Sequence, residues 1–397
     1  MSDFRRLWLA TAVSVLGTYG AAIALAVRTY QDTGRAAWVS AVFVAEFLPP
    51  LVIGLAFGER LNRLSPRRSL VASDLASMCC FAFLAVVHDP AAVVALATAA
   101  GAASGVFRPI SLAVVPALVG EEGIDRANAS LTAVDTAMTA IGQGLAGVVI
   151  VTAGAGVVLG ANAASFAASA LLLTGCHGID EPPAAGMPMV GARRQLRRSL
   201  RVVRRARPLR QVALSWVPMF AVLGVFNSME VPLLLGPFGA SPAVAGLTVA
   251  AATGGQVLGA LAAGRVGGTR IALLYPLLLA VIGAATLACG AAEALPVAVV
   301  AFVVCGIANG LALVHIRSTL QRSTASDQRA AVTALLISAS AVMTAGGAAV
   351  GGLLATAYSP RTAFLAAGVV GCGTALVAVA TRPGRLSATG QPGTSRT

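Results

Sequence analysis

The chain has 397 residues, of which 57% are hydrophobic and only 11% are charged. Soluble domains contain about 25% charged residues, so this chain has too few polar side chains to cover a water-facing surface of its size. A helix that spans a bilayer needs about 20 apolar residues, and the apolar content suffices for roughly eleven or twelve such helices. These numbers argue against a soluble enzyme and predict a multi-pass membrane protein.

The net charge of +13 comes from 28 basic residues, all of them arginine. Aromatic residues make up only 5% of the chain, so the stacking surfaces that bind nucleic acid are not expected. The six cysteines form no C-x-x-C pair, and there are only three histidines. We therefore expect no nucleic-acid partner, no metal site and no cofactor, and we interpret the positive charge as a determinant of membrane topology.

Continuous apolar runs, bounded by charged residues or by Gly/Pro clusters, predict the membrane spans. They do not alternate with a period of two, so they indicate helices and not the strands of an outer-membrane barrel. The fold class predicted is an all-α integral membrane protein with twelve transmembrane helices. The runs lie near residues 7–27, 37–58, 69–87, 91–118, 128–153, 155–175, 211–234, 243–264, 270–290, 294–316, 330–357 and 362–381.

The arginines are distributed unequally between the two sides of these spans. If the N-terminus is cytoplasmic, the outer segments hold only Arg28, Arg35 and Arg361, Arg108 lies within a span, and all the other arginines are on the inner side. Cytoplasmic loops of membrane proteins carry an excess of basic residues. We therefore expect both termini to be cytoplasmic and the protein to lie in the cell (inner or plasma) membrane.

Several local patterns recur at an offset of about 203 to 208 residues. Trp8 and Trp216 open the first and seventh runs, and Asp125-Arg126-Ala127 before the fifth run is repeated as Asp327-Gln328-Arg329-Ala330 before the eleventh. Such a parallel repeat predicts two six-helix bundles with a substrate site between them near the membrane midplane. The predicted segments are an N-terminal bundle (1–176), a cytoplasmic Arg-rich linker (177–210), a C-terminal bundle (211–382) and a disordered cytoplasmic tail (383–397).

The predicted linker contains nine arginines between Arg193 and Arg210. Within it, Leu196, Leu200 and Val203 lie on one face of a helix and most of the arginines lie on the other. This pattern is typical of an amphipathic helix that binds anionic lipid at the membrane surface. The alternative is a solvated run of charge that only fixes the topology.

The fourth and fifth runs carry Phe107-Arg108-Pro109-Ile110, Val115-Pro116-Ala117-Leu118-Val119 and Asp125-Arg126-Ala127-Asn128-Ala129-Ser130-Leu131. With twelve spans, the 6+6 repeat and a basic loop after the second span, residues 5–382 resemble the major facilitator superfamily. Within it the chain looks most like the bacterial branch that exports drugs and natural products. The resemblance implies a secondary active transporter, and we expect proton-coupled efflux of a small, largely apolar organic compound by a monomeric antiporter of the multidrug-resistance type.

Two other function classes stay open, uptake of a small metabolite by the same fold and a transport-dead membrane sensor. The sequence contains no H-E-x-x-H, no G-x-S-x-G and no nucleotide-binding glycine loop. We therefore expect neither an enzyme nor a pump driven directly by ATP.

The segment Glu59-Arg60-Leu61-Asn62-Arg63 keeps part of the family's loop signature, Gly-x-x-x-Asp-Arg-x-Gly-Arg-Arg. The resemblance implies that Glu59, Arg60 and Arg63 form a conformational latch between neighbouring helix ends through charge-assisted hydrogen bonds. Asp74, near the cytoplasmic end of the next span, is expected to be a structural partner of these arginines. The alternative is that the loop holds only topogenic charge.

Ionisable groups inside membrane spans cost about 2.5 to 3.5 kcal/mol, so each is a candidate for function. Glu46 lies near the middle of the second span with no assignable cationic partner, and we expect it to carry the proton. Its alternative is a structural hydrogen bond. Arg108 and Asp135 should lie at similar depth in the fourth and fifth spans, so we expect a pair that switches during coupling; a static salt bridge is the alternative.

Polar residues at helical spacing mark the faces expected to line the cavity. In the fifth span they recur at steps of three and four, and in the first span three hydroxyl residues share one face. Interhelical hydrogen bonds are the alternative for both stripes, and a surface charge is the alternative for Glu230. The substrate-cavity candidates are Thr11, Ser14, Thr18, Thr132, Thr139, Gln143 and Glu230.

Overall fold

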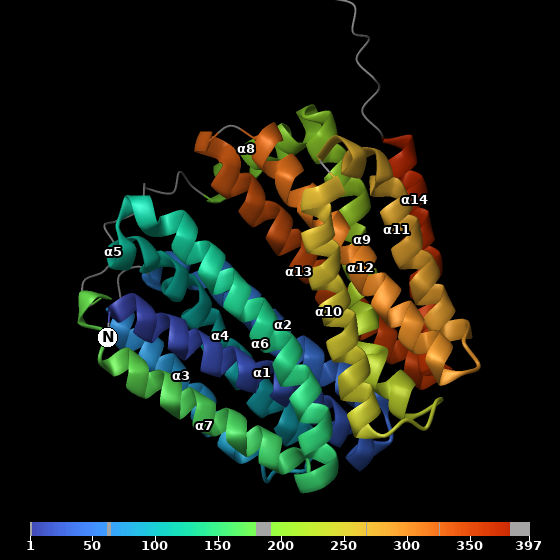
Figure 1. Cartoon of the computed structure of the whole chain (residues 1–397), viewed down its shortest axis with the longest axis horizontal. Coiled ribbons are helices and arrows are strands. Elements are labelled where there is room, and N and C mark those ends of the chain that lie inside the picture. The colour runs from blue at the N-terminus through green and yellow to red at the C-terminus, as the bar shows by residue number, and fades with distance from the viewer. Residues whose placement is uncertain (1, 62–64, 180–191, 267, 325, 382–397) are drawn as a thin grey trace, which may run out of the picture.

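A computed structural model of the chain describes residues 2–61, 65–179, 192–266, 268–324 and 326–381. Within these ranges the regular structure is entirely helical. Figure 1 shows the helices as two groups, one from each half of the sequence. The helices of the first group are α1 (Asp3–Thr33), α2 (Ala36–Leu61), α3 (Pro66–Leu84), α4 (Pro90–Ala113), the short α5 (Val115–Val119), α6 (Ile124–Ala153) and α7 (Ala155–Thr174).

The second group follows a separate helix, α8 (Ala192–Arg205), that lies between the two halves in the sequence. Each group contains six long helices, in agreement with the number of apolar runs in the sequence. The helices of the second group are α9 (Arg207–Leu235), α10 (Pro242–Val266), α11 (Gly268–Ala291), α12 (Leu295–Ser323), α13 (Ser326–Ala357) and α14 (Pro360–Ala380).

Eleven of the described helices are long and apolar enough to cross a membrane. The long helix outside this set is α3, which packs against α4 and α7 inside the first group. A protein that places so many apolar helices side by side spans a membrane many times, because water could not solvate their exposed faces.

Local sequence explains where several helices begin and end. Gly34 ends α1 in the left-handed conformation (φ +63°), which a residue without a Cβ adopts without strain. The Asp89 side chain accepts a hydrogen bond from the Ala92 amide at the start of α4, where Pro90 occupies the first helical position. The predicted run 91–118 is interrupted at Val114, just before Pro116, and so forms two helices, α4 and α5.

Two helices extend past the apolar runs of the sequence. The helix α1 continues beyond residue 27 to Thr33, so Arg28, which the sequence placed in an outer segment, lies inside the helix and is buried. The helix α9 begins at Arg207, within residues 177–210 that the sequence assigned to the linker.

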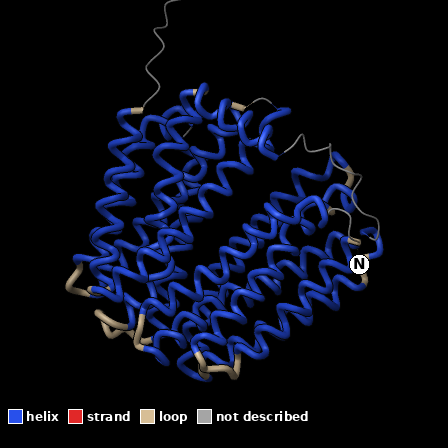
Figure 2. Tube along the Cα trace, turned by 180° about the vertical axis from the view of Figure 1, so that it is seen from behind, coloured by secondary structure: helices blue, strands red, loops and turns tan. Residues whose placement is uncertain are grey.

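The two groups meet mainly through two pairs of helices, α2 with α13 and α6 with α10, and α9 also contacts α1 and α2. In Figures 1 and 2 the groups are close together at one end and diverge toward the end that carries the start of α1, α5 and α8. Glycines permit the close contact. A Cβ on Gly246 of α10 would lie 2.6 Å from the Cα of Gly147 on α6, and a Cβ on Gly352 of α13 would lie 2.7 Å from Ser40 on α2.

Protein covers part of the apolar side of α8. Val203 is buried in a cluster with Leu209 of α9 and with Val332 and Leu336 of α13, whereas Leu200 is 38% exposed. The side chain of Leu196 lies outside the described part of the chain. The arginines of α8 whose side chains are described are exposed: Arg197, Arg198, Arg201, Arg204 and Arg205. Part of the apolar face of this helix therefore packs on the second group, and its basic face is available to lipid or water.

Candidate functional site

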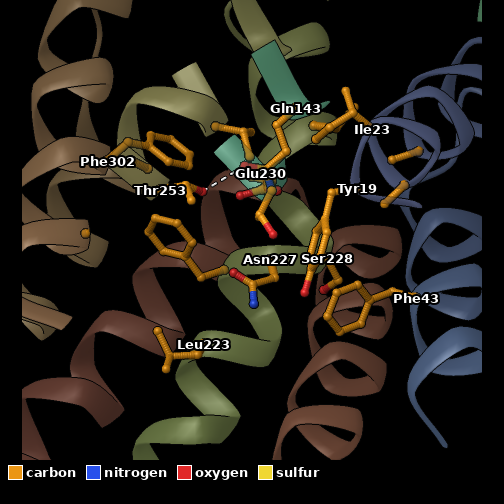
Figure 3. A pocket seen from close by; sticks show the side chains of 18 of the residues that line it. Tyr19, Ile23, Phe43, Gln143, Leu223, Asn227, Ser228, Glu230, Thr253 and Phe302 are labelled. Atoms are coloured by element: carbon orange, nitrogen blue, oxygen red, sulfur yellow. Dashed lines mark hydrogen bonds between the residues drawn. The ribbon is translucent and has the colours of Figure 1, made fainter. Parts of the chain in front are cut away.

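A cavity of about 310 Å³ lies between the two groups of helices (Figure 3). Its walls come from α1, α2 and α6 on one side and from α9, α10 and α12 on the other. The polar residues in the lining are Tyr19, Glu46, Thr139, Gln143, Asn227, Ser228, Glu230, Thr253, Gln256, Cys305 and Asn309, and the aromatic rings of Phe43, Phe47, Phe226 and Phe302 also line it. The remainder is aliphatic or glycine, so the site suits a small organic molecule with few polar groups.

One hydrogen bond crosses the cavity between the two groups. Thr253 Oγ1 of α10 donates to Gln143 Oε1 of α6 over 2.8 Å, and Figure 3 shows this bond beside Glu230. Gly147, one turn after Gln143 on α6, and Gly246, two turns before Thr253 on α10, bring the two helices into backbone contact. The hydrogen bond and the glycine contact therefore close the cavity at the end where the groups converge.

Two carboxyl groups face this cavity, Glu46 from α2 and Glu230 from α9. The lining includes no arginine, lysine or histidine. No hydrogen bond or ion pair joins either carboxyl group to another residue in the described ranges. Groups of three or more side chains that could hold a metal ion are also absent from the described residues.

Four of the sequence-predicted residues line the cavity: Glu46, Thr139, Gln143 and Glu230. Glu230, expected near the outer surface, is thus part of the central site. The other stripe residues do not line it. Thr11 Oγ1 donates to the backbone oxygen of Leu7, and Thr132 is exposed one turn before Asp135. Ser14 and Thr18 are partly buried on α1 outside the cavity lining.

Arg108 of α4 and Asp135 of α6 approach each other, with Nη2 and Oδ1 3.9 Å apart. The expected approach of these two residues is therefore present in the structure, and their side chains are 73% and 36% exposed. Asp135 shares a helix face with Thr139 and Gln143, and Thr139 Oγ1 donates to the Asp135 backbone oxygen. Asp135 precedes these cavity residues on α6, so the pair lies on the side of the cavity nearer the start of that helix. The role of the pair in coupling stays a prediction.

The predicted latch lies largely outside the described part of the chain, which contains neither Arg63 nor the side chains of Glu59 and Arg60. Asp74 is described and is 1% exposed on α3. Its Oδ2 atom has no hydrogen-bond partner, and no described arginine lies within ion-pair distance of it. The expected contact between Asp74 and the arginines of the loop is therefore not present in the described residues.

Sequence reasoning missed most of the second group's contribution, including Asn227, Thr253, Gln256 and Asn309. The repeat could have found two of these residues. The offset of 208 between Trp8 and Trp216 relates Tyr19 to Asn227, and an offset of 207 relates Glu46 to Thr253. The sequence does not identify the phenylalanines of the lining, because a phenylalanine that lines the cavity and one that faces lipid occur in the same kind of apolar run.

Two six-helix groups around a central cavity are the arrangement expected of a membrane transporter. In agreement, the sequence matches the profile of the Major Facilitator Superfamily over residues 7–237 and 219–396. The chain belongs to this superfamily and is a transporter, not an enzyme. No curated protein sequence matches the chain.

Solved structures share the fold at low sequence identity. A variant of the nucleoside transporter NupG superposes with a TM-score of 0.75 at 14% identity, covering 96% of this chain and 99% of that one. A bacterial homologue of the iron transporter ferroportin, in an inward-facing state, gives 0.77 at 12% identity, with 96% and 98% covered. A POT family transporter in complex with a thioalcohol-conjugated peptide gives 0.74 at 10% identity, with 95% of each chain covered.

Proposed function

We propose that the protein is a secondary active exporter that moves a small, largely apolar organic compound out of the cell in exchange for protons. The observation that carries this proposal is the cavity between the two groups, closed at one end, mostly apolar and lined by two carboxyl groups without a cationic partner. An unpaired carboxyl group in such a site can take up and release a proton as the cavity changes sides. Glu46 is the proposed proton carrier.

The arrangement of the groups supports alternating access. The diverging end carries the start of α1, α5 and the Arg-rich α8, and by the distribution of arginines this end is cytoplasmic. The structure then corresponds to a state open to the cytoplasm, from which an exporter loads its substrate. Separation of Gln143 from Thr253 and of Gly147 from Gly246 would open the opposite end.

Everted membrane vesicles test this proposal. Vesicles that contain the protein should accumulate the substrate when they are energised and lose it when an uncoupler is added. A comparison of metabolites retained by cells with and without the protein identifies the compound to use. Transport that depends on ATP and is unaffected by the uncoupler contradicts the proposal. Gradient-driven accumulation of the substrate by intact cells indicates uptake instead of export.

We propose anionic lipid as a partner and a monomer as the functional unit. The exposed arginines of α8 suit the headgroups of anionic lipids, since each basic side chain near such a surface contributes about 1 kcal/mol. A single chain supplies both halves of the cavity, which supports function as a monomer.

A further inference from the structure

The helix α2 contains two consecutive prolines, Pro49 and Pro50, in its interior. We propose that they form a hinge, at which the part of α2 from Leu51 onward bends toward α13 and so closes the open end of the cavity. This inference rests on the alternating access of the proposed function and adds to it a motion within the first group. Neither the substrate nor the direction of transport enters it.

The backbone of α2 lacks two helical hydrogen bonds at this point. Proline has no N–H group, so it cannot donate to the carbonyl oxygen four residues before it. Pro49 leaves the carbonyl of Ala45 without its helical donor, and Pro50 does the same for the carbonyl of Glu46. Sharp bends in helices occur almost always where such bonds are missing. Bending of α2 therefore breaks fewer hydrogen bonds here than elsewhere along the helix.

The neighbouring helix α4 has glycines beside the two prolines. A Cβ on Gly101 would lie 2.8 Å from the carbonyl oxygens of Ala45 and Glu46. A Cβ on Gly105 would lie 2.6 Å from the Cα of Pro50. The backbones of the two helices are therefore in direct contact here, as small residues allow. Because no side chain projects from α4 at these two positions, α2 can bend over this surface without a side chain in its path.

The two parts of α2 differ in how tightly they are packed. Among residues 36–53, whose side chains are described, the buried ones all precede the prolines: Ala36, Val39, Ser40, Val42 and Ala45. Burial ends there, and Phe47 and Val52 are 47% and 51% exposed. The first part of α2 is therefore fixed between its neighbours, whereas the described side chains at and beyond the prolines are less enclosed.

The contact between α2 and α13 stops where the cavity opens. Ser40, near the start of α2, lies against Gly352, near the end of α13, so the two helices are antiparallel. Seven residues after Ser40, on the same face of α2, Phe47 lines the cavity. Eleven residues after Ser40 lies Leu51, and eleven residues before Gly352 lies Ala341, and neither is buried. Bending at the prolines would bring Leu51 onto this small residue and extend the existing contact along both helices.

Distances between pairs of spin labels on the full-length protein test the inference without any substrate. The labels are attached to cysteines introduced at exposed positions, after the native cysteines have been replaced by serine. One pair joins Val52 to Ile337 of α13, across the two groups. A second pair joins Val52 to Leu171 of α7, within the first group, and the reference pair joins Leu112 of α4 to Leu171.

A bulky side chain at the closed end shifts the protein toward the opposite state. Gly246→Trp does so because even a Cβ at this position would lie 2.6 Å from the Cα of Gly147. Gly352→Trp acts in the same way at the contact with Ser40 and serves as the second variant. In either variant we expect the distance from Val52 to α13 to shorten and the distance from Val52 to α7 to lengthen, while the reference distance stays constant.

The double variant Pro49→Ala/Pro50→Ala restores both backbone donors. We expect its temperature of unfolding to equal or exceed that of the wild type, because the helix gains two hydrogen bonds. When it is combined with Gly246→Trp, the lengthening of the distance within the first group should disappear. Prolines that served only the stability of the fold would give a lower temperature of unfolding instead. The control is Pro276→Ala, the same change inside α11, which should leave the lengthening as it is.

Two results overturn the hinge and leave alternating access standing. In the first, the distance from Val52 to α13 shortens while its distance to α7 stays constant, because the groups then rotate as rigid bodies. In the second, the lengthening persists in folded Pro49→Ala/Pro50→Ala. Failure of the proposed function shows differently: if neither distance changes in variants with a wild-type gel-filtration profile, the open end does not close, which contradicts both alternating access and the hinge.

Discussion

At the scale of single residues, position in the cavity separates groups that look alike in the sequence. Glu46, Glu230 and Asp74 are all acidic residues inside apolar helices. The first two line the central cavity, where a substrate or a change of state can reach them, whereas Asp74 is enclosed within the first group of helices. Of these three residues, only Glu46 and Glu230 lie where a substrate in the cavity can contact them.

Replacing Glu46 with Gln should abolish gradient-driven transport while leaving the protein folded. The amide fills the same space as the carboxyl group but cannot carry a proton across the membrane. Uptake into everted vesicles, with the gradient set by acidification of the lumen, measures the effect. Glu293→Gln is the matched control, and wild-type rates of gradient-driven transport in Glu46→Gln would refute the assignment.

The Arg108–Asp135 pair should matter more for transport than for stability. Exposed ion pairs contribute about 0.2 to 1 kcal/mol, and this one is long and open to solvent. Arg108→Ala, Asp135→Ala and the double variant should therefore unfold within about 1 kcal/mol of the wild type. Thermal unfolding and transport assays of the three variants check this prediction. It is contradicted if either single variant loses much more stability than this and the double variant recovers it, because that pattern is typical of an ion pair buried in protein.

At the scale of helices, the two groups are held together by surfaces of small residues. The contact between α6 and α10 depends on Gly147 and Gly246, whose backbones approach too closely for a side chain. Small residues allow dispersion contacts between helices where the hydrophobic effect contributes little, because lipid is as apolar as the side chains. A contact made in this way can separate without exposing large apolar side chains to water.

Gly246→Ala should disrupt the closed end, because its Cβ would lie 2.6 Å from the Cα of Gly147. Overpacking of this kind costs about 1 to 3 kcal/mol. We expect a lower temperature of unfolding and at least a tenfold loss of transport. Gly254→Ala, two turns along the same helix with nothing within 4 Å, is the control and should be neutral or slightly stabilising. Equal behaviour of the two variants would contradict the role of this contact.

At the scale of the whole molecule, the distribution of arginines predicts that both termini and α8 are cytoplasmic. An epitope tag inserted at Gly239, in the loop between α9 and α10, should bind antibody on intact cells. A tag at the C-terminus should bind only after the membrane is permeabilised. The reverse pattern would invert the proposed direction of transport, because the open end of the cavity would then face outward.

The sequence predicts the overall architecture well because apolar length and arginine content act locally along the chain. It identifies four cavity residues, all of them polar or acidic groups that would be costly against lipid: Glu46, Thr139, Gln143 and Glu230. The sequence does not show that the Arg108 side chain is 73% exposed, because this exposure depends on how the helices are arranged in space. It also does not identify Phe226 or Phe302, whose rings come together from α9 and α12 only in the folded protein.

The low hydropathy of α3 has a consequence for how the protein is made. Among the long helices in the described ranges it is the one outside the apolar set, and Asp74 lies within it. Synthesis proceeds from the N-terminus, so α3 leaves the ribosome before α4 and long before α7, the helices that cover it. Until α7 follows, the face of α3 that α7 covers in the finished protein has no protein partner. Biogenesis of the first half is therefore complete only when its last helix has been inserted.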